Sequence, residues 1–247
     1  GRTQMTVFRL LPGGTLDPAF GTNGLVQLGT DLAMDHGTSL VLESDGRVTL
    51  AGLRGSSLVV VRLLANGAPD TSFGSGGGFT WGTELAGGGS LKLVRVPSGG
   101  YRVMVHVLQD GGLYANTVCR VLALTAAGAT DPAFGDGGLS GDVITVAKDS
   151  YCSSIGADAA GRVAVAGSLS DNSDSSVFVT RLLAGGSVDP GFDASTVASS
   201  LASVSAMAVA ANGQIALAGQ DKAGLSGALV ARLQADGRLD EVFGSGG

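Results

Sequence analysis

The chain has 247 residues, of which only 15% are charged, and it carries a net charge of −6 with a mean hydropathy of +0.34. It is too apolar for a disordered chain, and its acidic balance argues against nucleic acid or anionic membrane surfaces as partners, since these bind clustered Lys and Arg. No apolar run approaches the roughly 20 residues of a membrane-spanning helix. We therefore predict no membrane insertion and many short strands.

The first predicted elements are short apolar strands separated by turn residues. They are TVFRLL (6–11), GLVQLG (24–29), SLVLE (39–43), the segment 44–52 and LVVVRLL (58–64). The dipeptide Asp45-Gly46 lies between two of them, and such a pair is a strong signal for a tight hairpin because the turn needs positive φ. A weaker strand follows at 77–81.

The same order of elements returns further along the chain. A glycine turn followed by a strand occurs at 97–105, 159–167 and 211–219, where Asn212-Gly213 repeats the hairpin signal. Strands of the VFVTRLL type follow at 177–183 and 228–234. Each unit is therefore predicted to contain four short strands.

One six-residue motif marks the repeat. LDPAFG at 16–21 returns as PDTSFG, TDPAFG, VDPGFD and LDEVFG, with the shared aspartate at Asp17, Asp70, Asp131, Asp189 and Asp240. Successive aspartates are 53, 61, 58 and 51 residues apart. A repeat of this length indicates one supersecondary unit per copy.

The predicted fold is all-β, a β-propeller of four-stranded antiparallel blades that forms a single propeller or propeller segment over residues 1–247. Strands such as VAVAG are apolar at both odd and even positions, so both of their faces are apolar, as expected when small sheets stack face to face. A β-solenoid is the alternative, but its turns take roughly 20–30 residues. The chain holds about four full repeats plus partial blade strands at its ends. A closed four-bladed ring and part of a larger ring both remain open, and the second is favoured because the ends fall within repeats.

Three residues of the repeat have predicted structural roles. The aspartate is expected to cap a helical turn, often before proline, and the motif phenylalanine to fill the gap between sheets. Eight residues before the aspartate stands an arginine that we expect to pair with it or to bind turn carbonyls. These arginines are Arg9, Arg62, Arg181 and Arg232, whereas the third copy has Ala123, with Arg120 three residues earlier, and predicts a loop that is looser or held differently.

The two cysteines, Cys119 and Cys152, permit at most one disulfide and lack the spacing of a zinc site. They are either buried apolar residues or a bridge between neighbouring repeats.

Signatures of catalysis and metal binding are scarce. The histidines are His36 and His106, and no nucleophile elbow, metalloprotease motif or phosphate loop occurs. The segment Ser170 to Ser176 is rich in oxygen ligands but fits no calcium loop. No catalytic residue, metal ligand or cofactor is assigned.

The tryptophan and the tyrosines lie outside the fixed positions of the repeat and are free to serve a binding surface, although core packing is the alternative for each one. They are Trp81, Tyr101, Tyr114 and Tyr151. A protein or glycan partner on a propeller face is the expectation that follows, with self-assembly or membership of a larger repeat protein as further possibilities.

The combined pattern of Gly, Arg, Asp, Phe and Gly in register resembles the delta-60 repeat family of bacterial proteins over nearly the whole chain. The resemblance implies propeller-forming units in a secreted or cell-surface protein, and hence an exported chain whose signal segment is not in this sequence. It carries over no catalytic residue. The fourth copy departs from it, because Asp193 stands where the other copies have glycine, which puts the following turn in doubt.

Two function classes are therefore open. The favoured one is a non-enzymatic secreted or cell-surface binding or structural module, for adhesion or assembly. The alternative is an enzyme or enzyme accessory domain with its site at the mouth of the propeller.

Overall fold

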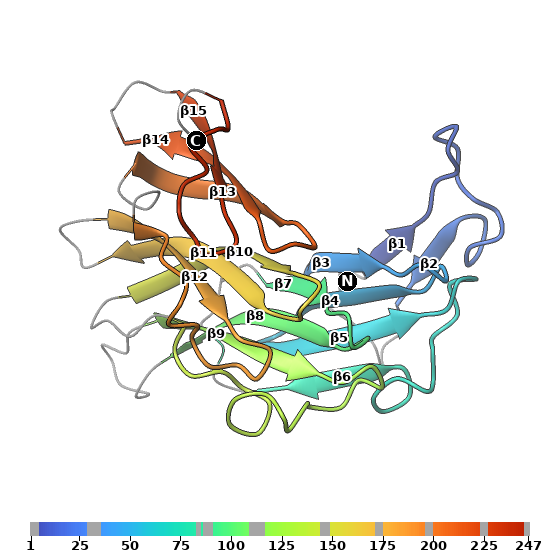
Figure 1. Ribbon diagram of the computed structural model, residues 1–247. Coiled ribbons are helices and arrows are strands. Elements are labelled where there is room, and N and C mark those ends of the chain that lie inside the picture. The colour runs from blue at the N-terminus through green and yellow to red at the C-terminus, as the bar shows by residue number, and fades with distance from the viewer. Residues whose placement is uncertain are drawn as a thin grey trace.

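The computed structural model describes residues 5–28, 36–82, 85, 91–108, 117–143, 149–170, 175–195, 200–222 and 227–244. The fold is all-β, as predicted, and consists of five antiparallel sheets that follow one another along an open arc (Figure 1). No described helix is long and apolar enough to cross a membrane.

Each sheet is a meander of consecutive strands, and we call the sheets units I to V. Unit I contains β1 (Thr6–Phe8) and β2 (Leu25–Gln27). Unit II contains β3 (His36–Leu42), β4 (Val48–Arg54), β5 (Ser57–Leu63) and β6 (Gly78–Trp81). Unit III contains β7 (Lys92–Arg95), β8 (Tyr101–Leu108) and β9 (Thr117–Leu124). Unit IV contains β10 (Asp149–Ala157), β11 (Val163–Ser170) and β12 (Ser175–Leu182). Unit V contains β13 (Leu201–Val209), β14 (Ile215–Asp221) and β15 (Ala228–Leu233).

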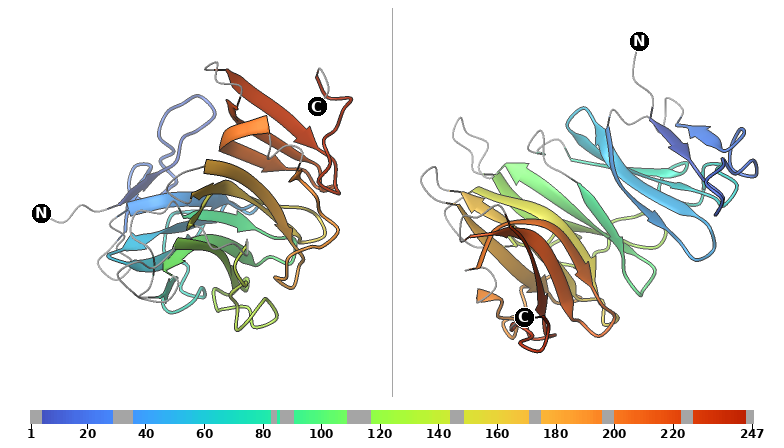
Figure 2. Two further views of the ribbon diagram at one scale, coloured as in Figure 1. Left: turned by 90° about the vertical axis from the view of Figure 1, so that its left-hand side faces the viewer. Right: turned by 90° about the horizontal axis from the view of Figure 1, so that it is seen from above.

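The first strands of units II to V line the inside of the arc. Strand β3 contacts β7, β7 contacts β10, and β10 contacts β13, so neighbouring sheets meet along these strands. Figure 2 shows the sheets spreading outward from this inner edge, with units I and V at the two ends of the arc and separated from each other.

Only unit II forms the predicted four strands among the described residues; unit I shows two strands and the others three. In unit III, a single bridge between Leu122 and Leu139 takes the place of a regular fourth strand. Among the described residues, the four-stranded blade is therefore present in one unit, and for the other units it stays a prediction.

The turn that leads into the fourth strand requires glycine. Gly21, Gly74 and Gly135 have φ of +57° to +58°, and a Cβ on any of them would lie about 2 Å from the carbonyl oxygen four residues on. Asp193 occupies this position in unit IV. Residues 196–199, which would complete the turn after it, lie outside the described residues, so the expectation of a different turn there stays a prediction.

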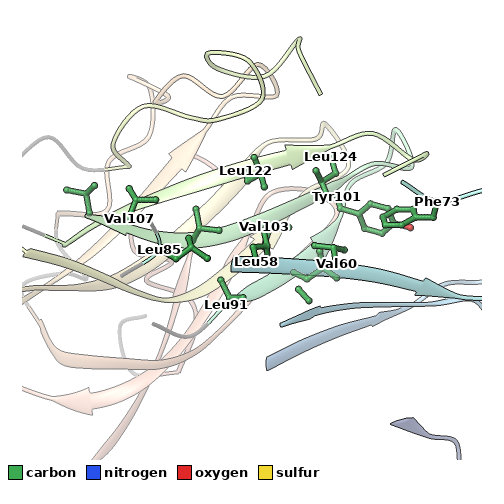
Figure 3. Packing of buried hydrophobic residues seen from close by; sticks show 14 residues of the cluster. Leu58, Val60, Phe73, Leu85, Leu91, Tyr101, Val103, Val107, Leu122 and Leu124 are labelled. Atoms are coloured by element: carbon green, nitrogen blue, oxygen red, sulfur yellow. The ribbon is translucent and has the colours of Figure 1, made fainter. Parts of the chain in front are cut away.

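The core lies between the sheets, because both faces of a sheet pack against neighbours. In Figure 3, Leu58, Val60 and Phe73 of unit II face Tyr101 and Val103 of unit III. Every residue of β5 after Ser57 is buried, on both faces of the strand. The prediction of strands buried on both faces is confirmed.

Cys119 of β9 and Cys152 of β10 form a disulfide between units III and IV, with a Cα–Cα distance of 5.9 Å. Of the two interpretations that the sequence left open, the structure supports the bridge. The disulfide closes a loop of 33 residues and joins the third and fourth sheets of the arc.

Reduction of this disulfide is expected to lower the free energy of unfolding by about 3–4 kcal/mol, because the unfolded chain regains the freedom of the closed loop. Urea unfolding with and without dithiothreitol measures the difference. The double variant Cys119→Ser/Cys152→Ser should unfold like the reduced protein, and its free energy of unfolding should be the same with and without dithiothreitol. Equal stability of the oxidised and reduced protein would contradict the expectation.

Candidate functional site

The repeated arginine pairs with the aspartate of its own unit. In four units its Nε donates to Asp Oδ2 at 2.7–2.8 Å, which confirms the pairing expected from the eight-residue spacing. The pairs are Arg9–Asp17, Arg62–Asp70, Arg181–Asp189 and Arg232–Asp240.

The same arginine also binds the next unit along the chain. Nη1 of Arg9 donates to the Ala65 carbonyl at 2.5 Å, and Nη1 of Arg62 donates to the Ala126 carbonyl at 2.6 Å. Arg181 makes the equivalent bond to Ala235. The guanidinium lies over the motif phenylalanine, at 4.6 Å in the case of Arg62 and Phe73, where the ring face attracts a cation.

The aspartate divides its two oxygens between two tasks. Oδ2 accepts from the arginine, while Oδ1 accepts from the backbone N–H two residues on, as Asp70 does from Ser72 at 3.1 Å. The segment that follows is a β-turn closed by the Phe73 N–H on the Asp70 carbonyl at 2.9 Å. The predicted cap is present, but it caps this turn where a helical turn was expected.

These contacts set the protonation of the carboxylate. Burial raises the pKa of Asp70, but the hydrogen bonds from Ser72 and the charge of Arg62 outweigh it, and the pKa lies below 3.8. In Asp189, burial is likewise outweighed by the Gly191 N–H and by Arg181, which lower its pKa. Both carboxylates remain available as acceptors at neutral pH.

A backbone bond completes the contact between units. The residue after the motif phenylalanine donates its N–H to a turn carbonyl of the next unit, from Gly74 to Ala127 at 2.7 Å, for example. The turn glycine of that next unit, Gly128, packs so closely that a Cβ would lie 2.8 Å from the Phe73 ring. We call the arginine, its aspartate, the phenylalanine and these two inter-unit bonds the inter-blade lock.

Unit III builds its lock from a different strand. Arg102 of β8 lies 3.3 Å from Asp131 and 4.5 Å above the ring of Phe134. Arg102 is the direct cross-strand partner of Ala123, the position that holds arginine in the other units. Arg120, which the sequence offered as the neighbouring arginine, binds Asp142 at 2.9 Å instead. The prediction that this loop is held differently is confirmed, and the pairing register was the signal that could have found Arg102.

A second buried polar group joins units II and III, and sequence reasoning missed it. Glu43 is buried and accepts from Thr49 at 2.9 Å and from the hydroxyl of Tyr101. Arg47 and Arg95 lie 3.2 and 3.5 Å from its carboxylate. Tyr101 is therefore a core residue and does not serve a surface.

The histidines do not come together as a catalytic pair in the described residues. His106 is buried, and its Nε2 accepts from the Cys152 N–H at 2.9 Å, beside the disulfide. Tyr151 lies 6.2 Å from the His106 ring and is 45% exposed. His36 begins β3, where only its backbone is described.

The other candidate residues contribute less. Trp81 is partly buried against the core between units II and III. Tyr114 and most of the oxygen-rich segment, residues 171–174, lie outside the described residues. Within the described part of the chain, no three His, Cys, Asp or Glu side chains gather as a metal site would require.

The connections between strands divide the arc into two faces. The turn between the first and second strands spans five residues in each of units II to V (43–47, 96–100, 158–162 and 210–214). This turn lies on the same side as the locks, and we call that side the motif face. On the opposite side, the loop face, the connections between second and third strands have two, eight, four and six residues (55–56, 109–116, 171–174 and 222–227). The variation in repeat length therefore arises partly on the loop face.

Comparison with known proteins identifies the class of the repeats. Residues 43–73, 161–192 and 210–243 match the family model of a β-propeller domain of unknown function, DUF5122. Each matched segment ends at or beside the motif phenylalanine, in units II, IV and V, whose locks use an arginine of the third strand. The chain thus carries β-propeller repeats, which agrees with its fold.

A search of curated proteins found no match. Among solved structures, the crystal structure of an endo-arabinase from Bacteroides thetaiotaomicron is similar, with 12% sequence identity and a TM-score of 0.43. The alignment covers 84% of this chain and 77% of the arabinase chain.

Replacing the lock arginine should destabilise the protein wherever the lock is complete. Arg62→Ala is expected to lower the free energy of unfolding by about 2–4 kcal/mol, because it removes the hydrogen-bonded cation of the buried Asp70 carboxylate and leaves only Arg47, at 3.8 Å. Arg232→Ala is the matched control: Arg232 also binds its aspartate and ring, but its side chain is 35% exposed and no described residue of a further unit covers it. Urea unfolding should show the larger loss for Arg62→Ala, and equal losses would contradict the role of the next unit.

The same measurement distinguishes the two arginines of unit III. Arg102→Ala should be strongly destabilising, whereas Arg120→Ala should cost less than about 1 kcal/mol, as is usual for a partly exposed ion pair.

His106 predicts a loss of stability in weak acid. Burial lowers its pKa below 6.5, and protonation at Nε2 would displace the bond from Cys152. Because the unfolded chain binds the proton more readily, the stabilising contribution is complete above pH 6.5 and is lost as the pH falls through the folded pKa.

Unfolding free energies measured from about pH 8 to about pH 5 test this prediction. His106→Gln keeps an acceptor without titrating in this range, so its profile should be flatter. Parallel profiles for the two proteins would contradict it. Losses from Asp70 and Asp189 occur only at lower pH, because their pKa values lie below 3.8.

Proposed function

We propose that this chain is an arc of a β-propeller with four-stranded blades of the delta-60 kind, and that it acts as a non-enzymatic binding or structural module of a secreted or cell-surface bacterial protein. Its partner is a protein or glycan that binds the loop face.

The division between the two faces carries this proposal. Constant turn lengths and a repeated lock make the motif face a scaffold, whereas the connections of the loop face differ in every unit. Loops of varying length on a constant framework are where binding functions concentrate. The charged side chains of the motif are occupied in holding units together, which leaves recognition to other residues.

Two exposed apolar side chains give the loop face a point of attachment. Tyr151 lies near the start of β10 and is 45% exposed, and Leu108 ends β8 and is 41% exposed. They belong to adjacent sheets joined by the disulfide, so their relative position is held firmly. An exposed tyrosine and an exposed aliphatic side chain on one face suit stacking on a sugar ring or packing against a protein side chain.

The disulfide also supports the proposed location. Disulfides persist in oxidising environments such as the periplasm, the cell surface and the extracellular medium, and they are rare in the reducing cytosol.

Binding is tested on a glycan array and on intact cells of the source bacterium. The parent protein should bind, and Tyr151→Ser/Leu108→Ser should lose most of the signal while keeping its thermal stability. Val188→Ser removes an apolar side chain of similar exposure on the motif face and should bind like the parent.

Mass spectrometry of the bound glycan separates the two function classes. A glycan recovered unchanged agrees with a binding module, whereas cleaved or modified glycan would overturn it in favour of an enzyme. Equal binding by the parent and the loop-face variant would overturn the assignment of the face.

A further inference from the structure

Unit V exposes a face that is buried in every other unit. The residue two positions before the lock arginine shows this. It is Val60 in unit II, which is fully buried, and Val179 in unit IV, which is 8% exposed, because the following unit covers each of them. The same position in unit V is Val230, which is 53% exposed. By strand register, this face of the sheet also carries small apolar side chains, those of Ala206, Ala208, Ala216, Ala218 and Ala228.

Unit I exposes the opposite face. The residue after the lock position is leucine in all five copies, and it is at most 1% exposed in Leu63, Leu124, Leu182 and Leu233, where it packs against the preceding unit. The fifth of these leucines, Leu10, is 50% exposed, and Phe8 on the same face is 61% exposed.

The lock is also incomplete at both ends of the arc. Among the described residues, Arg232 holds Asp240 and Phe243 but reaches no carbonyl of a further unit with Nη1. The carbonyls of Ala65 and Asn66, which accept the lock bonds in unit II, correspond to those of Pro12 and Gly13 in unit I, since both turns close with the same backbone bonds. Pro12 and Gly13 are exposed and accept no bond from the described residues.

The turn glycine of unit I marks the space where a lock would fit. At Gly67, Gly128, Gly186 and Gly237, a Cβ would lie 2.6–2.8 Å from atoms of the preceding unit. At the equivalent Gly14, with nearly the same φ of +82°, no atom lies within 4 Å. The surface that receives a phenylalanine and its following residue in the other units is therefore open in unit I.

We propose that a second copy of this chain docks head to tail at these ends, with unit I of one copy covering β13–β15 of the other. The contact continues the interface already formed between successive units. Leu10 and Phe8 would pack against Val230 and its alanine neighbours, and Nη1 of Arg232 would donate to the Pro12 carbonyl of the second copy.

Such a contact joins two different surfaces, so copies add head to tail, and an open assembly keeps one free face at either end until the arc closes into a ring. Association should then proceed beyond the monomer as the concentration rises, to a closed ring or to an open series. The proposal goes beyond binding at the loop face and does not depend on it, because loop-face variants leave both end faces intact.

Sedimentation velocity over a wide range of concentrations tests the proposal. The parent protein should exceed its monomer mass of 24.3 kDa progressively. Leu10→Asp and Val230→Asp should each remain monomeric, since each spoils one of the two faces at an exposed position. Val188→Asp, an equally exposed position outside both faces, should associate like the parent.

An equimolar mixture of Leu10→Asp and Val230→Asp is the decisive sample. Each variant keeps the face that the other lacks, so the mixture should form a dimer of twice 24.3 kDa and nothing larger. A parent protein that stays monomeric throughout, or a mixture that stays monomeric, would overturn the proposal. So would association blocked by only one of the two variants, which indicates a symmetric contact.

Discussion

The arginine of the inter-blade lock is the interaction on which the rest of the structure depends. Its planar group donates in several directions at once, so that one side chain holds its own aspartate, covers the phenylalanine ring and reaches a carbonyl of the next unit. Without it, a buried carboxylate would lack its cation and two adjacent sheets would lose their common anchor. The lock therefore couples the fold of each unit to its packing against the next.

Unit III shows which part of this constraint is essential. Its arginine comes from the second strand, yet the guanidinium lies over the phenylalanine at nearly the same distance as in other units. Arg102 directs Nη1 to the Tyr101 carbonyl of its own unit, so the bond from arginine to the next unit is replaced. At this interface the disulfide and the bond from Cys152 to His106 connect units III and IV instead.

The same lock explains why the motif face is constant and the loop face is variable. Residues on the motif face are held by buried charges and close backbone contacts, which leave little room for change in length or side chain. Among the described residues the locks lie on the motif face, so the connections of the loop face can differ in length without disturbing them. Both proposals rest on this arrangement: one on the variable face, and the other on the ends where the constant interface stops.

The sequence by itself determined the features that depend on local spacing. The repeat, the alternation of strands and turns, burial on both strand faces, and the pairing of Arg62 with Asp70 all follow within one unit, because a strand and its adjoining turn bring residues eight apart together. The tertiary structure alone decided that Arg62 reaches Ala126, that Arg102 replaces the arginine missing at Ala123, that Cys119 bonds to Cys152, and that Tyr101 is buried. These contacts cross between strands or sheets, and they depend on register and on the angle between sheets, which no local spacing specifies.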